Sequence, residues 1–313
     1  MSRRGGVYMS TRARHDERIR RIGKVPSVSV VIPTLNEAKN LAHVLPRIPD
    51  WVDEVIIVDG LSVDDTVEVA FRCLPNVRLV TTTMRGKGAA MRAGFEVARG
   101  DIIVTLDADG SNDPAEIAAF VGALMSGADV AMGSRFALGG GTSDMELHRK
   151  AGNWALTRLV RMLFGARFSD LCYGYVAFWS DVFPHLDGPF TGFEVETVMH
   201  IRAVRAELNI TEVPSFEAER IWGTSNLRTI SDGMRVLRSI CTEWRHNRVA
   251  PVATVSSLPS RDVDIDLVVL ETTETPRRVA SAPWARADEI VLDEIVLDDS
   301  DDERDLMVDE LAQ

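Results

Sequence analysis

The chain has 313 residues, of which 45% are hydrophobic, so it is long enough for one large core or two modest domains. No apolar run approaches the ~20 residues that span a bilayer, and the first 24 residues are too polar for a signal-peptide core. Three cysteines without paired or ligand-like spacing exclude a disulfide framework and a zinc site, which favours a reducing, cytoplasmic setting.

The net charge of −12 is distributed unevenly along the chain. Residues 1–24 hold eight Lys or Arg and two acids, whereas residues 250–313 hold five and seventeen. Polar segments with such an excess of charge rarely bury enough apolar surface to fold. We therefore expect a basic, disordered arm over 1–26, an ordered domain over 27–249, and an acidic, disordered tail beyond it. The short arm alone does not support nucleic-acid binding.

Short apolar strands alternate with helical patterns over residues 28–130. Strands are expected at Val28–Ile32, Glu54–Val58, Val77–Val80, Ile102–Leu106 and Asp129–Met132. Helices are expected near 37–45, 65–73, 88–98 and 114–125. This alternation predicts an α/β fold in which a parallel sheet is covered by helices on both faces. The strands are nearly all apolar, as expected when both faces of the sheet are buried.

The pattern changes after residue 132, where three consecutive glycines at 139–141 interrupt the chain. A helix is then expected at Leu147–Phe164, a strand at Gly174–Trp179, a helix near 194–206 and a strand near 209–213.

A long helix is expected from about Asn226 to Arg248. Its apolar residues are spaced three and four apart and form one stripe: Leu227, Ile230, Met234, Leu237, Cys241 and Trp244. Its arginines lie off that stripe, at positions 228, 235, 238, 245 and 248. We interpret the helix as packed on the core with a solvated basic face. The alternative is a helix that lies on an anionic membrane surface.

Two carboxylates, Asp107 and Asp109, follow the apolar strand that begins at Ile102. Residues two apart share one side of a strand if the strand continues, so the two side chains could converge. Hard divalent ions such as Mg2+ and Mn2+ take oxygen ligands and are often shared with substrate phosphates. The pair therefore suggests a metal site. The alternative is that Asp109 and Gly110 form only a turn.

Polar residues also follow the first two strands, at Pro33–Glu37 and at Asp59. Ligands of parallel α/β sheets bind beyond the carboxyl ends of the strands. We therefore expect these residues to face one crevice together with Asp107 and Asp109.

Cationic residues that could bind phosphate are found along the chain. Lys87 stands between two glycines at the start of a helix, but the spacing does not match a P-loop NTPase. Arg135, Arg149 and Arg220 are further candidates, because the guanidinium fork suits phosphate oxygens. Each of these residues could equally be a solvated surface cation.

Three carboxylates in the second half, Asp170, Glu194 and Glu196, accompany aromatic and glycine residues. They could act as general bases or position a sugar, and a purely structural role is equally compatible with the pattern.

Together these segments resemble the family 2 glycosyltransferases of GT-A fold, within them the polyprenyl-phosphate (dolichol-phosphate mannosyltransferase-like) branch. The resemblance runs from about Val28 to Arg245. Its motifs are Val-Ile-Pro-Thr-Leu-Asn-Glu-Ala (31–38), Ile-Ile-Val-Asp-Gly-Leu-Ser-Val-Asp-Asp-Thr (56–66), Gly-Lys-Gly-Ala-Ala-Met-Arg-Ala-Gly (86–94), Asp-Ala-Asp-Gly (107–110), Gly-Ser-Arg (133–135) and Gly-Thr-Ser-Asn-Leu (223–227). The chain departs from the family pattern at Gly60, where an acid is common, and at Ser111, where a metal-binding Gln often stands.

The resemblance implies a mostly parallel, Rossmann-like sheet with a nucleotide-sugar half (27–135) and an acceptor half (136–249). It implies that a nucleotide sugar is bound by Pro33, Asn36, Glu37, Asp59, Lys87 and Asp107. It implies Mg2+ or Mn2+ at Asp107 and Asp109, catalytic roles for Asp109, Arg135, Asp170 and Arg220, and an acceptor phosphate at Arg149 and Arg220.

The expected reaction is the inverting transfer of one sugar from a UDP- or GDP-sugar to a polyprenyl phosphate, as in the assembly of cell-envelope polysaccharides. A phosphate acceptor is already ionised and needs no general base. A hydroxyl of a glycan or small metabolite is the alternative acceptor, and it would need Asp170, Glu194 or Glu196 within about 3 Å. A third interpretation is a nucleotide-sugar-binding protein without catalysis.

The expected location is cytoplasmic, with peripheral contact to the inner face of the membrane. The basic arm and the arginines of the helix at 226–248 could provide that contact, at ~1 kcal/mol per well-placed cation. The acidic tail repeats Asp-Glu-Ile-Val-Leu at 288–292 and 293–297. It either docks a protein partner or is a disordered segment without one.

Overall fold

The computed structural model describes residues 11–143, 145–224, 227–247 and 268–270. All of them lie in one compact unit, Met1–Thr272. Its core is a sheet in the strand order β10-β3-β2-β1-β4-β7-β5-β8. The strands are β1 (Val28–Thr34), β2 (Glu54–Asp59), β3 (Arg78–Thr81), β4 (Ile102–Thr105), β5 (Val130–Ser134), β7 (Val176–Trp179), β8 (Ile210–Pro214) and β10 (Val268–Leu270). The sheet is parallel apart from β7 and β10, which run antiparallel to their neighbours.

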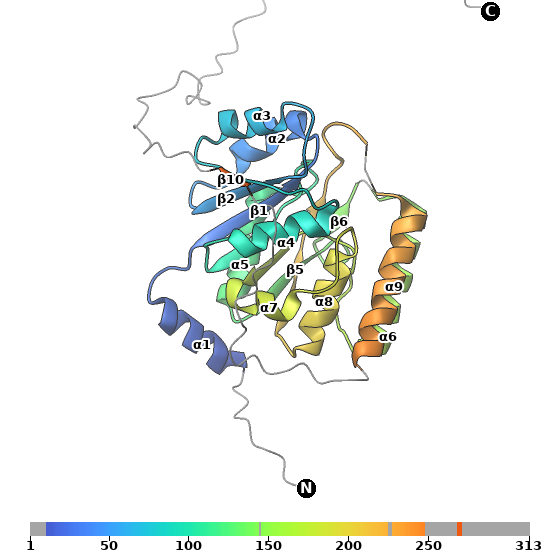
Figure 1. Ribbon diagram of the computed structural model, residues 1–313. Helices are drawn as coiled ribbons and strands as arrows, with labels where there is room; N and C mark the ends of the chain where they lie inside the picture. Colours follow the sequence, from blue (N-terminus) through green and yellow to red (C-terminus); the bar gives the residue numbers. More distant parts are fainter. Residues whose placement is uncertain (1–10, 144, 225–226, 248–267, 271–313) are drawn as a thin grey trace, which may run out of the picture. The chain divides into compact units, whose positions relative to one another are not determined.

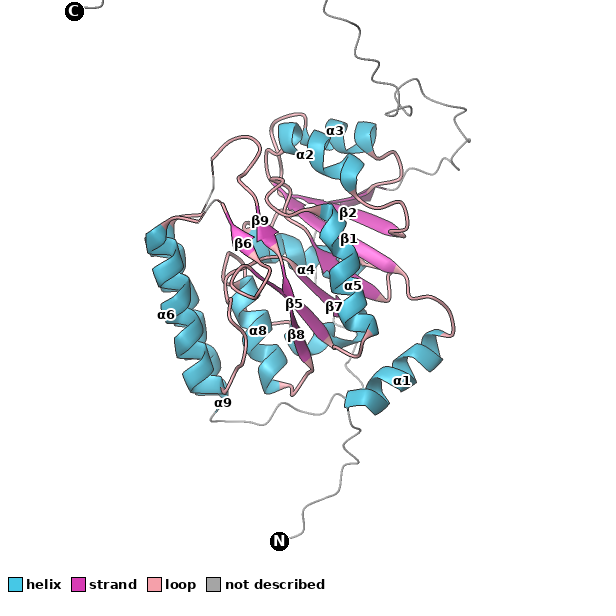
Figure 2. Ribbon diagram, turned by 180° about the vertical axis from the view of Figure 1, so that it is seen from behind, coloured by secondary structure: helices cyan, strands magenta, loops and turns pink. Residues whose placement is uncertain are grey.

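Helices cover both faces of this sheet, as Figures 1 and 2 show from opposite sides. They are α1 (Thr11–Ile22), α2 (Ala38–Val44), α3 (Thr66–Cys73), α4 (Lys87–Val97), α5 (Ile117–Met125), α6 (Leu147–Phe164), α7 (Phe183–Leu186), α8 (Val195–Arg205) and α9 (Thr229–Asn247). Helix α4 packs on β1 and β2, and α5 packs on β5 and β7. The approach of α4 is close because it has Gly94 at the contact, where a Cβ would collide with Val31 and Val58.

Two further features complete the fold. Helices α6 and α9 run side by side (Figures 1 and 2). A separate pair of short parallel strands, β6 (Gly141–Thr142) and β9 (Phe216–Glu217), joins the glycine-rich segment to the chain after β8. No helix among the described residues is both long and apolar enough to cross a bilayer.

The predicted elements are confirmed within a few residues at each end, and the helix at Leu147–Phe164 to the residue. Local pattern was sufficient here because the central strands of the sheet are buried on both faces. The four residues of β4, for example, are all buried.

The prediction of a disordered basic arm is wrong for Thr11–Ile22, which form α1. The reason is a tertiary contact. Arg18 is buried, and its guanidinium binds Asp129 at 3.1 Å and Asp181 at 3.0 Å while its Cζ lies 5.1 Å from the centre of the Trp179 ring. A buried cation needs such carboxylate partners, and they come from remote parts of the chain. Residues 1–10 lie outside the described part.

The predicted disordered tail is also wrong at one place, since Val268–Leu270 form β10 beside β3. These three residues add an antiparallel edge strand to the sheet. The tandem repeat at 288–297 lies outside the described residues.

The apolar stripe predicted to pack α9 on the core is partly wrong. Val236 and Ile240 are buried, but Ile230 is 83% exposed and Met234 and Cys241 are also exposed. The helix is therefore rotated relative to the predicted stripe.

The cause of this rotation is a buried carboxylate. Glu243 of α9 faces α8, where it accepts a hydrogen bond from Arg202 Nε at 2.9 Å and pairs with Arg205. Satisfying this charge turns part of the apolar stripe outward.

Candidate active site

The polar residues after β1, β2 and β4 meet at one edge of the sheet, as predicted. The register pairs Thr34 with Asp59 and Val31 with Thr105, so the three strands end side by side. Strand β4 ends at Thr105, and therefore Asp107 and Asp109 belong to the following loop. The prediction that the two carboxylates converge relied on the alternation of side chains along a strand, and this alternation does not apply to a loop. Each of them has its own cationic partner.

Asn36 and Asp59, which are predicted to bind the nucleotide, shape the loops after β1 and β2. Asn36 adopts a left-handed conformation (φ 58°), and its Oδ1 accepts the Val63 N–H at 2.8 Å. The Asp59 carboxylate accepts the N–H groups of Leu61 and Ser62, both at 3.1 Å. These side chains hold the loop after β2 against the loop after β1. Pro33 is half-buried in β1, opposite Val58.

Lys87, at the start of α4, forms a partly buried ion-pair cluster. Its Nζ lies 2.8 Å from Asp107 Oδ1 and 2.9 Å from Oε1 of Glu196, which is on α8. Burial alone would lower the pKa of the ammonium, but the charges of Asp107 and Glu196 raise that pKa above its ordinary value. Lys87 is therefore cationic. The neighbouring position is Gly174, where a Cβ would lie 2.7 Å from Nζ.

Arg220 contacts both Glu37, which is predicted to bind the nucleotide, and Asp109, which is predicted to bind the metal. Its Nη1 lies 2.9 and 3.0 Å from the two carboxylate oxygens of Glu37, and its Nη2 lies 3.3 Å from Asp109 Oδ2. The other oxygen of Asp109 accepts hydrogen bonds from the N–H and hydroxyl of Ser111, at 3.0 and 2.7 Å. The serine that replaces the family's glutamine thus orients the second acid of the motif.

The segment that carries Arg220 is fastened over the loop after β4. Trp222 donates its N–H to Asn40 Oδ1 at 2.9 Å and accepts from Asn40 Nδ2 at 3.1 Å. The N–H of Ile221 donates to the carbonyl of Asp109 at 3.1 Å. Gly110 has φ +82°, and a Cβ there would collide with the Ile221 side chain. These contacts place Arg220 at the crevice, and Asn40 was not among the predicted site residues.

Arg135 and Asp170 form a sealed pair, with side-chain exposures of 2% and 0%. Arg135 Nε donates to Asp170 Oδ2 at 2.7 Å, and Nη2 donates to Oδ1 at 2.9 Å. Nη1 donates to Glu217 at 3.1 Å, and the guanidinium lies 4.7 Å from the centre of the Tyr173 ring. Burial opposes the charge of Arg135, but the hydrogen bonds and charge of Asp170 raise its pKa. In this arrangement both charges are satisfied within the protein by Glu217, Asn153 and each other.

The remaining predicted residues have mixed placements. Arg149 lies in the first turn of α6 with a half-buried side chain, and its contact with an acceptor stays a prediction. Glu194 Oε1 accepts the N–H groups of Thr191 and Gly192 at 2.9 and 3.0 Å, so it caps the loop before α8. Glu217 was missed because an isolated glutamate in a short strand carries no signal in the sequence.

The metal prediction depends on Asp107 and Asp109. Among the described residues, no group of three or more His, Cys, Asp or Glu is arranged to hold an ion. Mg2+ is nevertheless commonly bound by one or two carboxylates together with substrate phosphates. Both acids are partly exposed at the crevice, with oxygen donors of the right chemistry. The residues therefore fit a metal that is completed by a bound diphosphate.

Comparison with known proteins identifies the family. The model of glycosyl transferase family 2 matches residues 29–193, more than half of the chain. The chain belongs to glycosyltransferase family 2. The predicted family and the prediction of a glycosyltransferase are thereby confirmed.

Two similar proteins have names that refer to a polyprenol or its phosphate. The undecaprenyl-phosphate mannosyltransferase of Micrococcus luteus is 34% identical over 214 residues, which cover 64% of this chain and 87% of that protein. The polyprenol monophosphomannose synthase of Mycolicibacterium smegmatis is 31% identical over 211 residues, which cover 63% and 80%.

A solved structure shows the same fold. The glucosyl-3-phosphoglycerate synthase of Mycobacterium tuberculosis, crystallised with Mn2+, UDP and glucosyl-3-phosphoglycerate, has a TM-score of 0.57 and 21% identity. The match covers 87% of this chain and 94% of that one. The predicted GT-A fold with a mostly parallel sheet is confirmed.

Proposed function

We propose that this family 2 glycosyltransferase moves a hexose from a nucleoside-diphosphate sugar to a polyprenyl phosphate, with inversion at the anomeric carbon. The observation that carries the proposal is the state of the three candidate bases. Asp170 is sealed against Arg135, Glu194 caps a loop, and Glu196 pairs with Lys87. An ionised phosphate attacks without a base, whereas a hydroxyl acceptor would need one. The lipid-phosphate acceptors named for the relatives point the same way.

The donor would lie along the crevice. Asn36, Asp59 and Glu37 would present the loops around its nucleotide, and Lys87 would face its diphosphate. Lys87 and Arg220 supply fixed positive charge where the departing diphosphate accumulates negative charge, which is the electrostatic part of catalysis. Lys87 is already oriented by Asp107 and Glu196, so this cation needs little reorganisation when the donor binds.

Asp107 and Asp109 would hold a divalent metal together with the donor diphosphate. Such an ion supplies Lewis-acid stabilisation of the leaving group. Arg220 now occupies Asp109 Oδ2, so this arginine and a metal would compete for that oxygen. Once released from Asp109, Arg220 would be available to a phosphate, in keeping with its predicted contact to the acceptor.

The proposal is tested by incubating the full chain with UDP- or GDP-sugars, Mn2+ or Mg2+, and a short polyprenyl phosphate, with mass spectrometry of the product. Formation of a glycosyl phosphodiester supports it, and Asp109→Asn should abolish metal-dependent turnover. The matched control is Asp53→Asn at the opposite ends of the strands, where the carboxylate accepts the Val28 N–H. Transfer to a polyprenol alcohol or a glycan in preference to the phosphate would refute the lipid-phosphate acceptor.

A lipid acceptor requires access to a membrane, and α9 offers a suitable surface. Ile230 and Met234 are exposed, and Arg238 and Arg245 are exposed on the same helix. An amphipathic helix with basic residues can lie on an anionic surface. We expect salt-sensitive binding to anionic liposomes that weakens in I230S/M234S and is retained in L138S, which changes a loop residue that is more exposed than either. Unchanged binding of I230S/M234S would exclude this surface. Docking of a protein partner by the acidic tail stays a prediction.

A further inference from the structure

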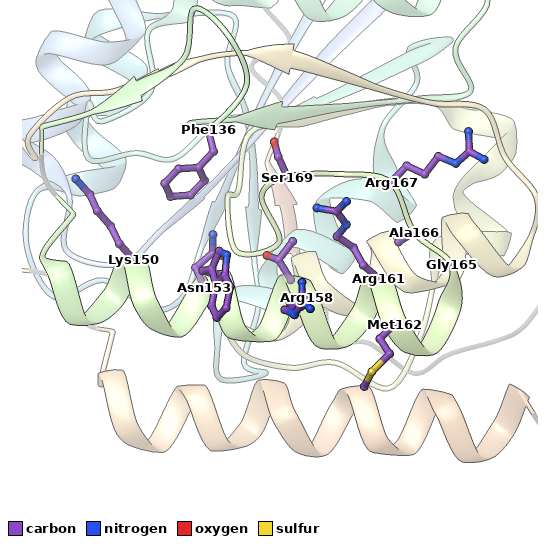
Figure 3. A pocket seen from close by; sticks show the side chains of 12 residues that line it. Phe136, Lys150, Asn153, Arg158, Arg161, Met162, Gly165, Ala166, Arg167 and Ser169 are labelled. Carbon is purple, nitrogen blue, oxygen red and sulfur yellow. The ribbon is translucent and has the colours of Figure 1, made fainter.

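A second cavity, of about 710 Å3, lies between α6 and the segment that follows it (Figure 3). It contains none of the residues of the crevice clusters. Its lining residues are Phe136, Lys150, Asn153, Trp154, Thr157, Arg158, Arg161, Met162, Gly165, Ala166, Arg167 and Ser169. Among the lining residues, Asn153 contacts the Arg135–Asp170 pair: its Nδ2 donates to Asp170 Oδ1 at 2.9 Å. Arg135 Nη2 donates to the same oxygen.

The cavity is strongly cationic. Lys150, Arg158, Arg161 and Arg167 all line it, and no Asp or Glu does. Throughout the part of the chain that the structure describes, none of these four cations forms an ion pair with a carboxylate. Figure 3 shows Lys150 and Arg161 extending from α6 on the side of Phe136 and Ser169, Arg158 in front of the helix, and Arg167 extending outward from the segment after it. Arg158 lies over the Trp154 ring, 5.9 Å from its centre. Four cations that have no carboxylate partner among the described residues are a favourable environment for an anion of more than one charge.

A buried hydroxyl gives a second, independent indication of a ligand. Thr157 lines the cavity, is only 4% exposed, and its Oγ1 has no hydrogen-bond partner among the described residues. A buried hydroxyl without a partner costs free energy, and such groups are rare in native proteins. An oxygen of a bound anion would satisfy it.

Exposed apolar side chains also line the cavity. Trp154 and Met162 are 67% and 74% exposed, and Phe136 is also partly exposed. A free inorganic anion would make no use of these side chains. An anion attached to hydrocarbon would bury them while its charge met the four cations.

We propose that this cavity binds the phosphate head group of an anionic phospholipid, with Thr157, Arg158 and Arg161 on the phosphate and the exposed apolar side chains on the lipid chains. Lys150 and Arg167 add positive charge to the same cavity. The site is distinct from the crevice where sugar transfer is proposed. Its occupation requires neither donor nor acceptor, so the proposal stands or fails independently of the proposed reaction.

The test uses titration calorimetry of the full chain with dihexanoyl phosphatidylglycerol, kept below its micelle concentration so that no membrane is present. We expect saturable binding that is weaker for dihexanoyl phosphatidylcholine and for inorganic phosphate. The variant R158Q/R161Q/R167Q should bind the anionic lipid about tenfold less tightly or worse, the loss expected when charge-assisted hydrogen bonds are removed. The matched control R12Q/R20Q/R72Q removes the same charge from exposed arginines outside the cavity and should bind normally.

Two single variants separate the parts of the site. Thr157→Val keeps the shape and removes the hydroxyl, so it should weaken lipid binding without lowering Tm, because Oγ1 makes no hydrogen bond to the described protein. Trp154→Ala should weaken binding of the lipid and leave binding of inorganic phosphate unchanged.

Three outcomes would overturn the proposal. One is equal affinity of the cavity triple variant and its control for the anionic lipid. Another is inorganic phosphate that binds as tightly as the lipid. The third is a short prenyl phosphate that displaces the phospholipid at equal concentration, which would assign the cavity to the acceptor instead.

Discussion

The Asp170→Asn substitution distinguishes a positioning role of this residue from the catalytic role that its sequence context suggests. Asp170 is fully buried and accepts hydrogen bonds from Arg135 Nε at 2.7 Å, from Arg135 Nη2 at 2.9 Å and from Asn153 Nδ2 at 2.9 Å. Asparagine retains the shape but removes the charge that compensates the buried guanidinium. Breaking a buried pair in this way costs about 3–5 kcal/mol. Glu217, at 3.1 Å from Arg135, still compensates part of the charge of the guanidinium. We therefore expect a loss of unfolding free energy at the lower end of this range, about 3 kcal/mol.

The free energy of unfolding is measured by urea titration. A loss of about 3 kcal/mol corresponds to a fall in Tm of roughly 6–12 °C for a domain of this size. The matched control is Glu17→Gln in the exposed pair with Arg20, which should change stability by less than about 0.5 kcal/mol. The double variant R135M/D170L should recover part of the loss, because it removes both charges at once. Unchanged stability of Asp170→Asn, combined with loss of activity, would refute the positioning role and restore Asp170 as a base.

Three further predictions concern other charges. Arg220→Gln should raise the affinity for Mn2+ in a titration without donor, because the arginine no longer competes for Asp109 Oδ2. The rate of sugar transfer should fall in the same variant. An unchanged affinity for Mn2+ would show that the metal does not use that oxygen. Glu196→Gln removes one of the two carboxylates that contact Lys87, so the ammonium is no longer held in place. We expect turnover to fall by more than the KM of the donor changes. A change in KM alone would contradict this role of Glu196. Burial lowers the pKa of His200 from 6.5 in the unfolded chain to about 4, so the unfolded state gains the proton first. The stability it contributes is complete above pH 6.5 and is lost as pH falls towards 4, by about 3 kcal/mol. In His200→Leu, urea titrations at pH 7 and pH 5 should differ less than in the unaltered chain, and an equal difference would contradict the assignment.

The order of the elements and the location of the crevice could be predicted from the sequence because both depend on local pattern. Strands buried on both faces are mostly apolar, as β1 and β4 are, and the helices between them show a helical spacing of apolar residues. Since adjacent parallel strands end at one edge of a sheet, residues such as Asn36, Asp59 and Asp107 had to lie near one another.

The errors occurred where a charge finds a remote partner. The charge of Arg18 led to the prediction that α1 belongs to a solvated arm. The Arg18 side chain is in fact buried against Asp129 and Asp181, which are more than a hundred residues away in the sequence. Glu243 rotated α9 away from its apolar stripe for the same reason. A sequence shows that a residue is charged and does not show which opposite charge the fold brings to it.

The sequence by itself determined the α/β fold, the family and the edge of the sheet that carries the polar residues, because burial of apolar strands and the direction of parallel strands follow from the chain. Only the tertiary structure decided which of the predicted arginines is available at the crevice. Arg135 is sealed by Asp170 and Glu217, whereas Arg220 reaches Glu37 and Asp109 at the partly exposed site. The physical reason is that desolvation and charge pairing depend on neighbours brought together by folding, and both arginines look alike in the sequence.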